Sequence, residues 1–383
     1  MQMYKNSVEP STPLQEGNGK EVEKTTETDR LERAENEKWM RRCLQLARCG
    51  RMGAAPNPMV GAVIVYKGRI IGEGYHIRCG EAHAEVRAIG SVRPADRDFL
   101  KDSTIYVSLE PCAHYGRTPP CVELIVRTGI PRVVVGCVDP FARVSGRGID
   151  ILRKAGVEVT VGVLEEECLE LNRRFITAQT KGRPYITLKW AVSADGFLDA
   201  WREGPFDEAE KFWRPGAILD RMNRRVPAEK PTQAAQLSTS YSLVAVHHLR
   251  ATNQAILVGH NTLRLDRPSL TIRHWSGNDP LRVVLGTVGE SELPSGFVAY
   301  ADINTMLDAL HEQGIQSLLV EGGAQTIKSF IDRGLWDEAR EELSTRLLGC
   351  GVPVPKMPVG VVRRSEQTFG VTVNHWKNFE GTL

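Results

Sequence analysis

Strand-like and helix-like segments alternate along the chain, and the alternation starts a second time near residue 181. The first series begins with a helical repeat of apolar residues after residue 30 and continues with a hairpin pattern that turns at KG (67–68). After the turn-rich stretch KGRP (181–184), strand-like runs occur at YITLKWAVS (185–193), QAILVG (254–259), LRVVLG (281–286) and QSLLVEGG (316–323), with helical stretches at 241–251, 303–313 and 324–334. Because strands that alternate with helices form layered sheets, we predict two α/β domains.

Domain boundaries follow from this pattern and from local composition. With 383 residues, the chain is long enough for two hydrophobic cores. Residues 1–34 are polar and poor in large apolar side chains, so we expect a disordered tail there. We assign residues 35–180 to a first domain and residues 181–383 to a second. Within the second, residues 201–235 are rich in charge, proline and tryptophan, and we expect them to form an insertion.

Charge and hydropathy argue against several classes of partner. A net charge of +2 provides no electrostatic basis for binding nucleic acid or an anionic membrane. No apolar run is long enough to cross a bilayer, and the polar N-terminus lacks the apolar core of a signal peptide. We therefore expect a cytoplasmic protein in a reducing compartment, where eight cysteines do not form a disulfide framework. A homo-oligomer is compatible with the sequence.

Two cysteines and one histidine have the pattern of a zinc site. Cys112 and Cys121 lie in SLEPCAHYGRTPPC (108–121) with eight residues between them, and His83 opens a predicted helix in GEAHAEVRA. A catalytic zinc site has three protein ligands and one open position for water. Glu85 follows His83 by two residues, where zinc deaminases carry the carboxylate that moves protons without binding the metal. We therefore predict three zinc ligands and one proton shuttle.

Other interpretations of these residues exist. Taken alone, His83 is a surface or core histidine, and the two cysteines are buried thiols. A structural zinc site needs a fourth protein ligand, for which His114 lies nearby, but an open site equipped with a glutamate fits catalysis better. Cys79 is outside the pattern and is treated as a non-ligand. The remaining cysteines have no partner at ligand spacing and are expected to pack in the interior: Cys43, Cys49, Cys137, Cys168 and Cys350.

With these residues in place, the chain resembles a known family, the bifunctional deaminase–reductases of riboflavin biosynthesis (the RibD family). Three segments of the first half resemble its deaminase: PNPMVGAVIV (56–65), GEGYHIRCGEAHAEVRAI (72–89) and SLEPCAHYGRTPPC. Three segments of the second half resemble its reductase: LKWAVSADGFLD (188–199), VHHLRATNQAILVGHNTLRLDRPSLTIR (246–273) and LLVEGGAQTIKSFI (318–331). The wide cysteine spacing with GRTPP inside it distinguishes this family from cytidine and tRNA adenosine deaminases, which usually have C-x-x-C.

The resemblance implies both a fold and a pair of reactions. It implies a cytidine-deaminase-like three-layer α/β/α domain followed by a dihydrofolate-reductase-like α/β domain. It implies zinc-dependent hydrolysis of the 2-amino group of 2,5-diamino-6-(5-phosphoribosylamino)pyrimidin-4-one. It then implies reduction of 5-amino-6-(5-phosphoribosylamino)uracil, whose ribosyl group becomes ribityl, with NADPH. The expected partner is thus a small phosphorylated pyrimidine.

Residue roles carried over from the resemblance are specific. In the deaminase half, His83, Cys112 and Cys121 ligate zinc, Glu85 shuttles protons and Asn57 hydrogen-bonds the substrate, although Asn57 taken alone is a turn residue between two prolines. In the reductase half, the implied substrate contacts are Lys189, Ser238, Thr239, Arg250, Asp266, Leu270, Arg273 and Glu321. The implied cofactor contacts are Thr262, Gly322, Gly323 and Thr326.

The residues themselves give weaker reasons for the same roles. Arg250 and Arg273 are able to grip a phosphate with two hydrogen bonds each, and Lys189 adds charge, although each taken alone is a solvated surface charge. Asp266 is a candidate to protonate or position the opening sugar. Gly322 and its neighbour join a strand to a helix, an arrangement that also occurs in ordinary turns. SADG (193–196) ends the first strand of the second half, where open sheets bind ligands, although Asp195-Gly196 is equally plausible as a plain turn.

Three departures from the family pattern and two alternative functions remain open. Phe141-Ala142 stands where the family often has Asn-Pro, Gln236-Leu237 stands where many members have Trp-Ile, and residues 201–235 are longer than usual.

One alternative function is that of a deaminase of nucleic-acid bases whose second half only binds substrate or nucleic acid. The near-neutral charge and the lack of an aromatic–basic stripe argue against it. The other alternative is a zinc-stabilised scaffold without activity.

Overall fold

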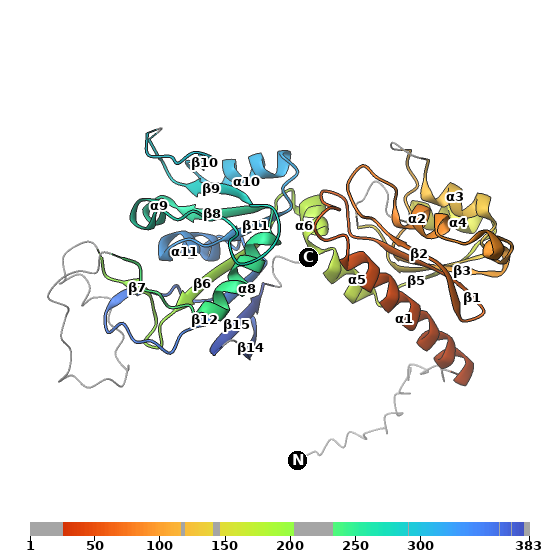
Figure 1. Cartoon of the computed structure of the whole chain (residues 1–383), viewed down its shortest axis with the longest axis horizontal. Helices are drawn as coiled ribbons and strands as arrows, with labels where there is room; N and C mark the ends of the chain where they lie inside the picture. The colour runs from red at the N-terminus through yellow and green to blue at the C-terminus, as the bar shows by residue number, and fades with distance from the viewer. Residues whose placement is uncertain are drawn as a thin grey trace, which may run out of the picture.

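The computed structural model describes residues 26–115, 119–140, 146–202, 233–289, 291–359, 361–368 and 370–378. Within these ranges the chain forms two large sheets, each with its own hydrophobic core, and Figure 1 shows them side by side. Residues 1–25 of the predicted tail and residues 203–232 of the predicted insertion lie outside the described ranges.

The first helix, α1 (Glu27–Arg48), begins earlier than the sequence analysis expected. Thr26 and Asp29 form a capping box, in which the Thr26 hydroxyl accepts from the Asp29 N–H at 3.2 Å and the Asp29 carboxylate accepts from the Thr26 N–H at 2.9 Å. Residues 27–34 are therefore helical, and their assignment to a disordered tail was wrong. The start is polar because this end of the helix projects beyond the core, and local capping stabilises it in place of apolar burial.

The first sheet contains five strands in the order β2-β1-β3-β4-β5. Their bounds are Gly61–Tyr66 for β1, Arg69–Tyr75 for β2, Thr104–Leu109 for β3, Arg132–Cys137 for β4 and Glu158–Val161 for β5. β1 pairs antiparallel with β2 and β3, whereas β4 pairs parallel with β3 and β5. Lys67 and Gly68 both have positive φ, 47° and 72°, which matches the expected tight hairpin between β1 and β2.

Helices cover both faces of this sheet, so the predicted three-layer α/β/α arrangement is confirmed. One face packs against α2 (Ala84–Gly90), α3 (Cys121–Thr128) and α4 (Arg147–Lys154), and the 3₁₀ helix η1 (Pro94–Asp102) adds Leu100 to that core. The other face packs against α1 and α5 (Glu165–Leu171) through residues that include Met40 and Cys168.

The helical segment that follows β5 is interrupted. It is divided at Asn172 into α5 and α6 (Arg173–Lys181). The side chain of Asn172 is buried and bonds the backbone of Met59 twice, accepting from its N–H at 2.8 Å and donating to its carbonyl at 3.0 Å. These bonds tie the junction to the segment before β1 and hold Asn172 away from helical backbone angles.

The second sheet contains eight strands in the order β10-β9-β8-β11-β6-β12-β15-β14. The six strands from β10 to β12 are parallel, and β15 pairs antiparallel with both β12 and β14. Their bounds are Tyr185–Val192 for β6, Ala255–Gly259 for β8, Leu281–Leu285 for β9, Phe297–Tyr300 for β10, Ser317–Val320 for β11, Glu338–Leu343 for β12, Val362–Thr368 for β14 and Val371–Lys377 for β15. A separate antiparallel pair joins β7 (Phe197–Ala200) to β13 (Gly351–Pro353).

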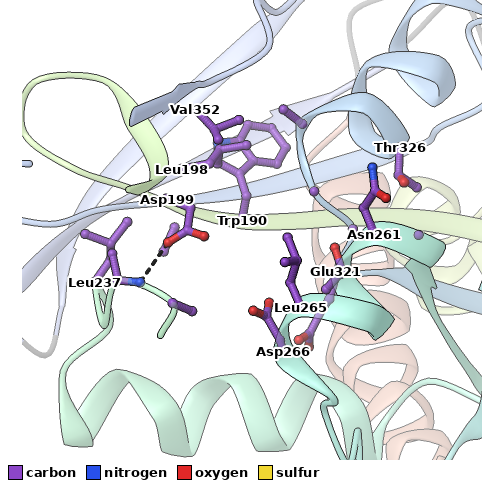
Figure 2. A pocket seen from close by; sticks show the side chains of 18 of the residues that line it. Trp190, Leu198, Asp199, Leu237, Asn261, Leu265, Asp266, Glu321, Thr326 and Val352 are labelled. Atoms are coloured by element: carbon purple, nitrogen blue, oxygen red, sulfur yellow. Dashed lines mark hydrogen bonds between the residues drawn. The ribbon is translucent and has the colours of Figure 1, made fainter. Parts of the chain in front are cut away.

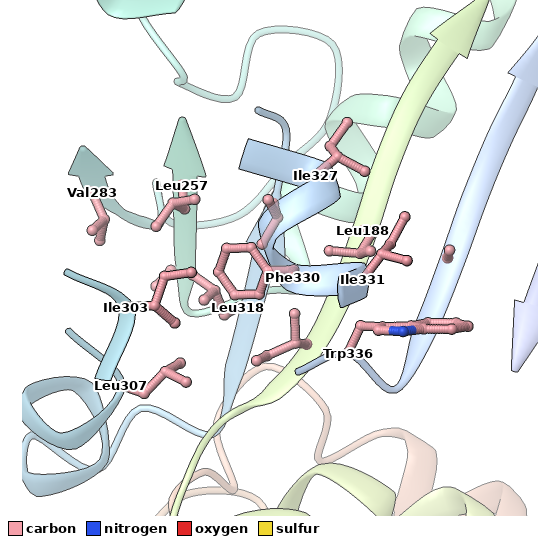
Figure 3. Close-up of a cluster of buried hydrophobic side chains, with 14 of the residues drawn as sticks. Leu188, Leu257, Val283, Ile303, Leu307, Leu318, Ile327, Phe330, Ile331 and Trp336 are labelled. Carbon is pink, nitrogen blue, oxygen red and sulfur yellow. The ribbon is translucent and has the colours of Figure 1, made fainter. Parts of the chain in front are cut away.

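Four helices cover this sheet, and the three helices predicted in this half are present. α10 (Ile303–Glu312) and α11 (Ala324–Asp332) cover one face, where Phe330 and Trp336 are fully buried among aliphatic residues of the strands (Figure 3). α8 (Ser240–Ala251) and α9 (His260–Asp266) cover the opposite face. Both faces are covered, as expected for parallel strands rich in Val, Ile and Leu.

The two halves meet around α6, which lies between the sheets (Figure 1). α6 ends at Lys181 and β6 begins at Tyr185, so the proposed boundary near residue 181 falls at the end of α6. Ion pairs cross the junction from Arg173 to Glu338 at 3.5 Å and from Lys377 to Glu170 at 3.1 Å. The side-chain amide of Gln316 also donates to the carbonyl of Pro56 at 2.6 Å. In the described part of the chain, no helix combines the length and apolar character needed to span a membrane.

Candidate active sites

The three predicted zinc ligands converge at one point of the first domain. The Nδ1 atom of His83 lies 3.5 Å from the sulfur of Cys112 and 3.4 Å from the sulfur of Cys121, and all three ligand atoms lie within 4.8 Å of one another. His83 immediately precedes α2, and Cys121 is the first residue of α3. Two helix N-termini therefore point their positive ends at the cluster, which favours thiolate over thiol.

The chemistry of this donor set fits zinc. Hydrogen bonds from Cys121 and His83 lower the pKa of Cys112 to about 4 although burial opposes the shift, so Cys112 is a thiolate at neutral pH. Two sulfurs and one imidazole nitrogen form the open three-ligand set of a catalytic site. Among the described residues, the cluster of possible ligands has no fourth His, Cys, Asp or Glu. This count agrees with a catalytic site and not with a closed structural one.

Glu85 lies beside the cluster without belonging to it. Its side chain is buried, and its carboxyl hydrogen-bonds Cys121. Burial, together with the negative charge of Cys112, raises the pKa of Glu85 to about 7. A carboxyl with such a pKa accepts and releases a proton near neutral pH, which is the property that a proton shuttle needs. A bound dication would lower this pKa again by adding positive charge nearby.

Asn57 reaches the same site through a histidine that the sequence analysis did not single out. The Nδ2 atom of Asn57 lies 3.1 Å from Nε2 of His76, and Nδ1 of His76 lies 3.2 Å from the carbonyl of Ala82. Burial lowers the pKa of His76, which favours the neutral ring, and its ring meets that of His83 edge-on at 5.4 Å between centroids. The only signal in the sequence was its place in the segment of residues 72–89 that also contains His83.

In the described part of the loop between the two cysteines, His114 and Tyr115 face solvent. Tyr115 is exposed and donates its hydroxyl to Glu123 at 2.7 Å, and His114 is also exposed. Arg117 and the departure at 141–142 lie outside the described residues. Glu110 has a structural role that the sequence analysis missed: its buried carboxylate accepts from the backbone N–H groups of Gly146 at 2.9 Å and Gly148 at 2.8 Å.

The other cysteines separate into two groups. Cys43, Cys137 and Cys168 are fully buried, as predicted for packing residues. Cys49 and Cys79 are exposed and Cys350 is half-buried, so the packing role expected for Cys49 was wrong. Cys49 is the C-cap of α1, and it lies outside the apolar face of that helix.

A second site is a cavity of about 940 Å³ in the reductase-like half, at the ends of β6, β8 and β11 (Figure 2). Eight of the twelve residues expected to bind substrate or cofactor in this half line it: Lys189, Ser238, Thr262, Asp266, Glu321, Gly322, Gly323 and Thr326. Residues that the sequence analysis did not assign complete the walls, and they include Trp190, Leu198, Asp199, Arg202, Asn261, Leu265 and Val352. Gln236 and Leu237, the departures from the family pattern, also line it.

Thr326 accounts for two glycines of the cavity wall. A Cβ atom on Gly259 would lie 2.3 Å from the Thr326 hydroxyl oxygen, and one on Gly322 would lie 2.6 Å from the Thr326 Cβ. Gly323 is the N-cap of α11 and faces the hydroxyl of Thr262, 3.3 Å from an added Cβ. The ends of β8 and β11 therefore approach α11 at backbone distance, and the exposed N–H groups of α11 border the cavity.

Arg250 is paired with a carboxylate of the protein, and its contact with substrate stays a prediction. Its guanidinium forms two hydrogen bonds with Glu321, from Nε to Oε1 at 3.1 Å and from Nη2 to Oε2 at 2.7 Å, and Nη1 donates to the carbonyl of Thr271 at 3.3 Å. The fork expected to bind a phosphate is thus occupied by a carboxylate of the protein, and Arg250 does not line the cavity. Although burial opposes it, this pairing lowers the pKa of Glu321.

Three other expected substrate contacts also lie outside the cavity wall. Thr239 is the N-cap of α8 and accepts from the Ser242 N–H at 3.1 Å. Leu270 is buried in the apolar cluster beneath α8 and α9. Arg273 is exposed, and its backbone N–H donates to Nδ1 of His247 at 3.0 Å. Each has a local structural role, and their contact with substrate stays a prediction.

Ser193 and Asp195 form a turn in place of a ligand site. The Ser193 hydroxyl donates to Asp195 at 2.6 Å, and Asp195 accepts from the backbone N–H groups of Leu348 at 3.1 Å and Gly349 at 2.7 Å. Neither residue lines the cavity. The polar groups of this strand end hold the segment after β12, which supports a plain turn over a ligand contact.

Asp266 enters the cavity as half of an ion pair. Its Oδ1 lies 2.7 Å from Nη2 of Arg202, and the same guanidinium contacts Asp199 at 2.6 Å. Arg202 is nearly buried, so this pairing is only weakly screened by solvent. An aspartate held by a guanidinium is suited to accept hydrogen bonds, which favours positioning of the sugar over protonation of it. Burial also lowers the pKa of Lys189, which lines the same cavity.

Comparisons with known proteins cover both halves. Residues 33–137 match the family described as "Cytidine and deoxycytidylate deaminase zinc-binding region", and residues 184–361 match the "RibD C-terminal domain". The chain is 34% identical over 360 residues to the riboflavin biosynthesis protein RibD of Aquifex aeolicus, covering 85% of this chain and 92% of that one. It is 33% identical over 360 residues to RibD of Escherichia coli, covering 82% and 89%.

Solved structures show the same relationship. The structure of Acinetobacter baumannii RibD, form 1, superposes with a TM-score of 0.74 at 29% identity and covers 90% of this chain and 99% of that one. The diaminohydroxyphosphoribosylaminopyrimidine deaminase/5-amino-6-(5-phosphoribosylamino)uracil reductase of Thermotoga maritima superposes with a TM-score of 0.72 at 32% identity, with the same coverage. The similarity extends over both halves.

Proposed function

We propose that both sites act in riboflavin biosynthesis, because this chain belongs to the RibD family, whose members are bifunctional deaminases and reductases. The first half is a zinc-dependent deaminase, and the second half is an NADPH-dependent reductase. The deaminase removes the 2-amino group of 2,5-diamino-6-(5-phosphoribosylamino)pyrimidin-4-one. The reductase converts the ribosyl group of 5-amino-6-(5-phosphoribosylamino)uracil to ribityl. The observation that carries this proposal is the convergence of His83, Cys112 and Cys121 beside the buried Glu85.

For the deaminase, His83, Cys112 and Cys121 would hold zinc, which when bound lowers the pKa of a water molecule. Glu85 takes a proton from the attacking water and delivers it to the departing amine, and a carboxyl with a raised pKa can perform both steps. Asn57 orients the pyrimidine by hydrogen bonds, and His76 holds the Asn57 amide in place.

For the reductase, NADPH supplies the hydride to C1′ of the opened ribose. We propose that Thr262, Thr326 and the N–H groups at the start of α11 hold the cofactor, since they border the cavity together. Lys189 and Ser238 face the same space and bind the phosphorylated substrate. Asp266 positions a sugar hydroxyl. Arg250 acts indirectly, by holding Glu321 in the cavity wall.

Partners and location follow as proposals from the same chemistry. The substrate is a small phosphorylated pyrimidine, and the net charge of +2 supports a small molecule over nucleic acid. Thiolate ligands require a reducing compartment, so we propose the cytoplasm. The boundary between the deaminase and reductase domains lies near residue 181. A measurement of the molar mass in solution would show whether the chain forms a homo-oligomer.

A coupled assay tests the proposed function. The purified chain is loaded with zinc and incubated with the diaminopyrimidinone substrate, and ammonia release and NADPH oxidation are followed separately. We expect both signals, with NADPH oxidation dependent on prior release of ammonia. Ammonia without NADPH oxidation would contradict the reductase assignment, and salt-sensitive binding of tRNA would instead favour a nucleic-acid substrate.

A further inference from the structure

A side chain of the second domain contacts the segment that carries Asn57 in the first. Gln316 immediately precedes β11 and is 6% exposed. Its side-chain amide donates to the carbonyl oxygen of Pro56 at 2.6 Å, across 260 residues of sequence. That carbonyl belongs to the peptide bond that leads into Asn57. Gln316 therefore holds the backbone directly before a residue to which we assign substrate binding.

Gln316 is itself firmly anchored. Its backbone N–H donates to the side chain of Gln254 at 2.8 Å, and its carbonyl accepts from the N–H of Tyr185 at 2.9 Å. These bonds join it to the start of β8 and to β6, in the middle of the eight-stranded sheet. Because both its backbone groups are used in the sheet, its side chain is a fixed point on the second domain.

On the other side of this contact, a chain of interactions leads to a zinc ligand. The Asn57 backbone N–H donates to the carbonyl of Ala54 at 2.9 Å, and its side chain lies 3.1 Å from His76. The ring of His76 packs edge-on against that of His83. The side-chain amide of Gln316 in the reductase domain is thus linked to the ligand cluster of the deaminase through Pro56, Asn57, His76 and the zinc ligand His83.

We propose that Gln316 is a positioning residue for deamination, acting through the Pro56–Asn57 peptide to set where the Asn57 amide meets the pyrimidine. The reductase domain thereby completes the substrate-binding geometry of the deaminase. This inference rests on the deaminase function proposed above. It assigns no step of the chemistry to Gln316, because this side chain contacts the protein and not the reacting atoms.

The test uses the full-length, zinc-loaded chain with the variant Gln316→Glu, which keeps the shape of the side chain and replaces its donor by an acceptor. We expect KM for the diaminopyrimidinone in ammonia release to rise about three- to ten-fold, the effect of one hydrogen bond, with kcat little changed. Zinc content, and NADPH oxidation with 5-amino-6-(5-phosphoribosylamino)uracil supplied directly, should match those of the unmutated chain. Gln313→Glu is the matched control, since Gln313 is exposed three residues earlier.

A double-mutant cycle separates positioning from general destabilisation. If Gln316 acts through Asn57, Gln316→Glu should add little to the KM of an Asn57→Ala chain, whereas independent effects would multiply. Multiplying effects, an unchanged KM, or an equal loss of both activities with a lower melting temperature would overturn the inference. A failure of the unmutated chain to release ammonia would instead overturn the proposed function, and this inference with it.

Discussion

Arg250 and Glu321 form a two-bond ion pair at the wall of the reductase cavity, with Nε–Oε1 at 3.1 Å and Nη2–Oε2 at 2.7 Å. Their side chains are 13% and 12% exposed, so the pair is largely withdrawn from water. Glu321 immediately follows β11 and lines the cavity, whereas Arg250 lies in α8 on one face of the sheet. The Glu321 carboxylate therefore lines the cavity while it is paired with the Arg250 guanidinium.

Removal of Arg250 should destabilise the chain more than removal of a surface cation. Arg250→Ala leaves the Glu321 carboxylate buried without a partner, and we expect the free energy of unfolding of the second domain to fall by about 3 kcal/mol. Lys328→Ala is the control, because Lys328 and Asp332 form an exposed pair whose loss should cost less than about 1 kcal/mol. Urea unfolding measures both, and equal losses would contradict a buried pair.

The same pair makes stability depend on pH. The bonds from Arg250 lower the pKa of Glu321 below its ordinary value of 4.5. A lowered folded-state pKa contributes stability that is present above the unfolded pKa and is lost as the pH falls through the folded one. We expect the free energy of unfolding to decrease between about pH 5 and pH 3, and to decrease less in Glu321→Gln. If the free energy of unfolding depended on pH identically in the unmutated chain and in Glu321→Gln, Glu321 would not be a source of that dependence.

Glu85→Gln should separate proton transfer from metal binding. The amide keeps the shape of the carboxyl but does not accept a proton from water, so we expect ammonia release to fall by about 10²- to 10⁴-fold. Zinc content by mass spectrometry should be unchanged, because Glu85 is not part of the ligand cluster. Glu123→Gln is a suitable control on the neighbouring helix α3, where the carboxylate accepts from the exposed Tyr115. Retained deamination by Glu85→Gln would rule out the proposed shuttle.

Removal of zinc should disable one activity and spare the other. A chelator strong enough to strip the site of His83, Cys112 and Cys121 is expected to abolish ammonia release. NADPH oxidation with 5-amino-6-(5-phosphoribosylamino)uracil should continue, since the cavity lined by Lys189 and Thr326 belongs to a separate sheet. Zinc restored in slight excess should recover ammonia release. A parallel loss of NADPH oxidation would show that metal binding also stabilises the second domain.

One central strand of the second half, β12, escaped the sequence analysis because most of its side chains are charged. β12 reads EAREEL, yet it lies inside the sheet between β6 and β15. Glu342 is fully buried and accepts from the Ser242 hydroxyl at 2.6 Å, and Glu341 accepts from the Asn374 amide at 2.6 Å. Such a strand has no apolar run to recognise. Its glutamates pair with polar side chains of α8 and β15, and those partners are known only once the sheet is assembled.

The zinc donors and their shuttle were accessible from the sequence because the signals are local. His83 and Glu85 lie two residues apart at a helix start, and both cysteines border strand and helix ends that turn residues mark. Alternation of strands and helices likewise predicted two layered α/β folds, since backbone periodicity is a property of neighbouring residues. Helix caps and tight turns, such as the one at Lys67 and Gly68, belong to the same class.

Only the tertiary structure decided how distant side chains pair. It placed Glu321, 71 residues away in the sequence, against the Arg250 guanidinium that was expected to bind a substrate phosphate. It placed His76 on Asn57 and joined Gln316 to Pro56 across the domain junction. Each of these contacts depends on the packing of whole sheets and helices, where the free energy of burying a charge or an amide selects the partner. The sequence by itself determined which chemistry the chain carries, and the fold decided which residues are free to perform it.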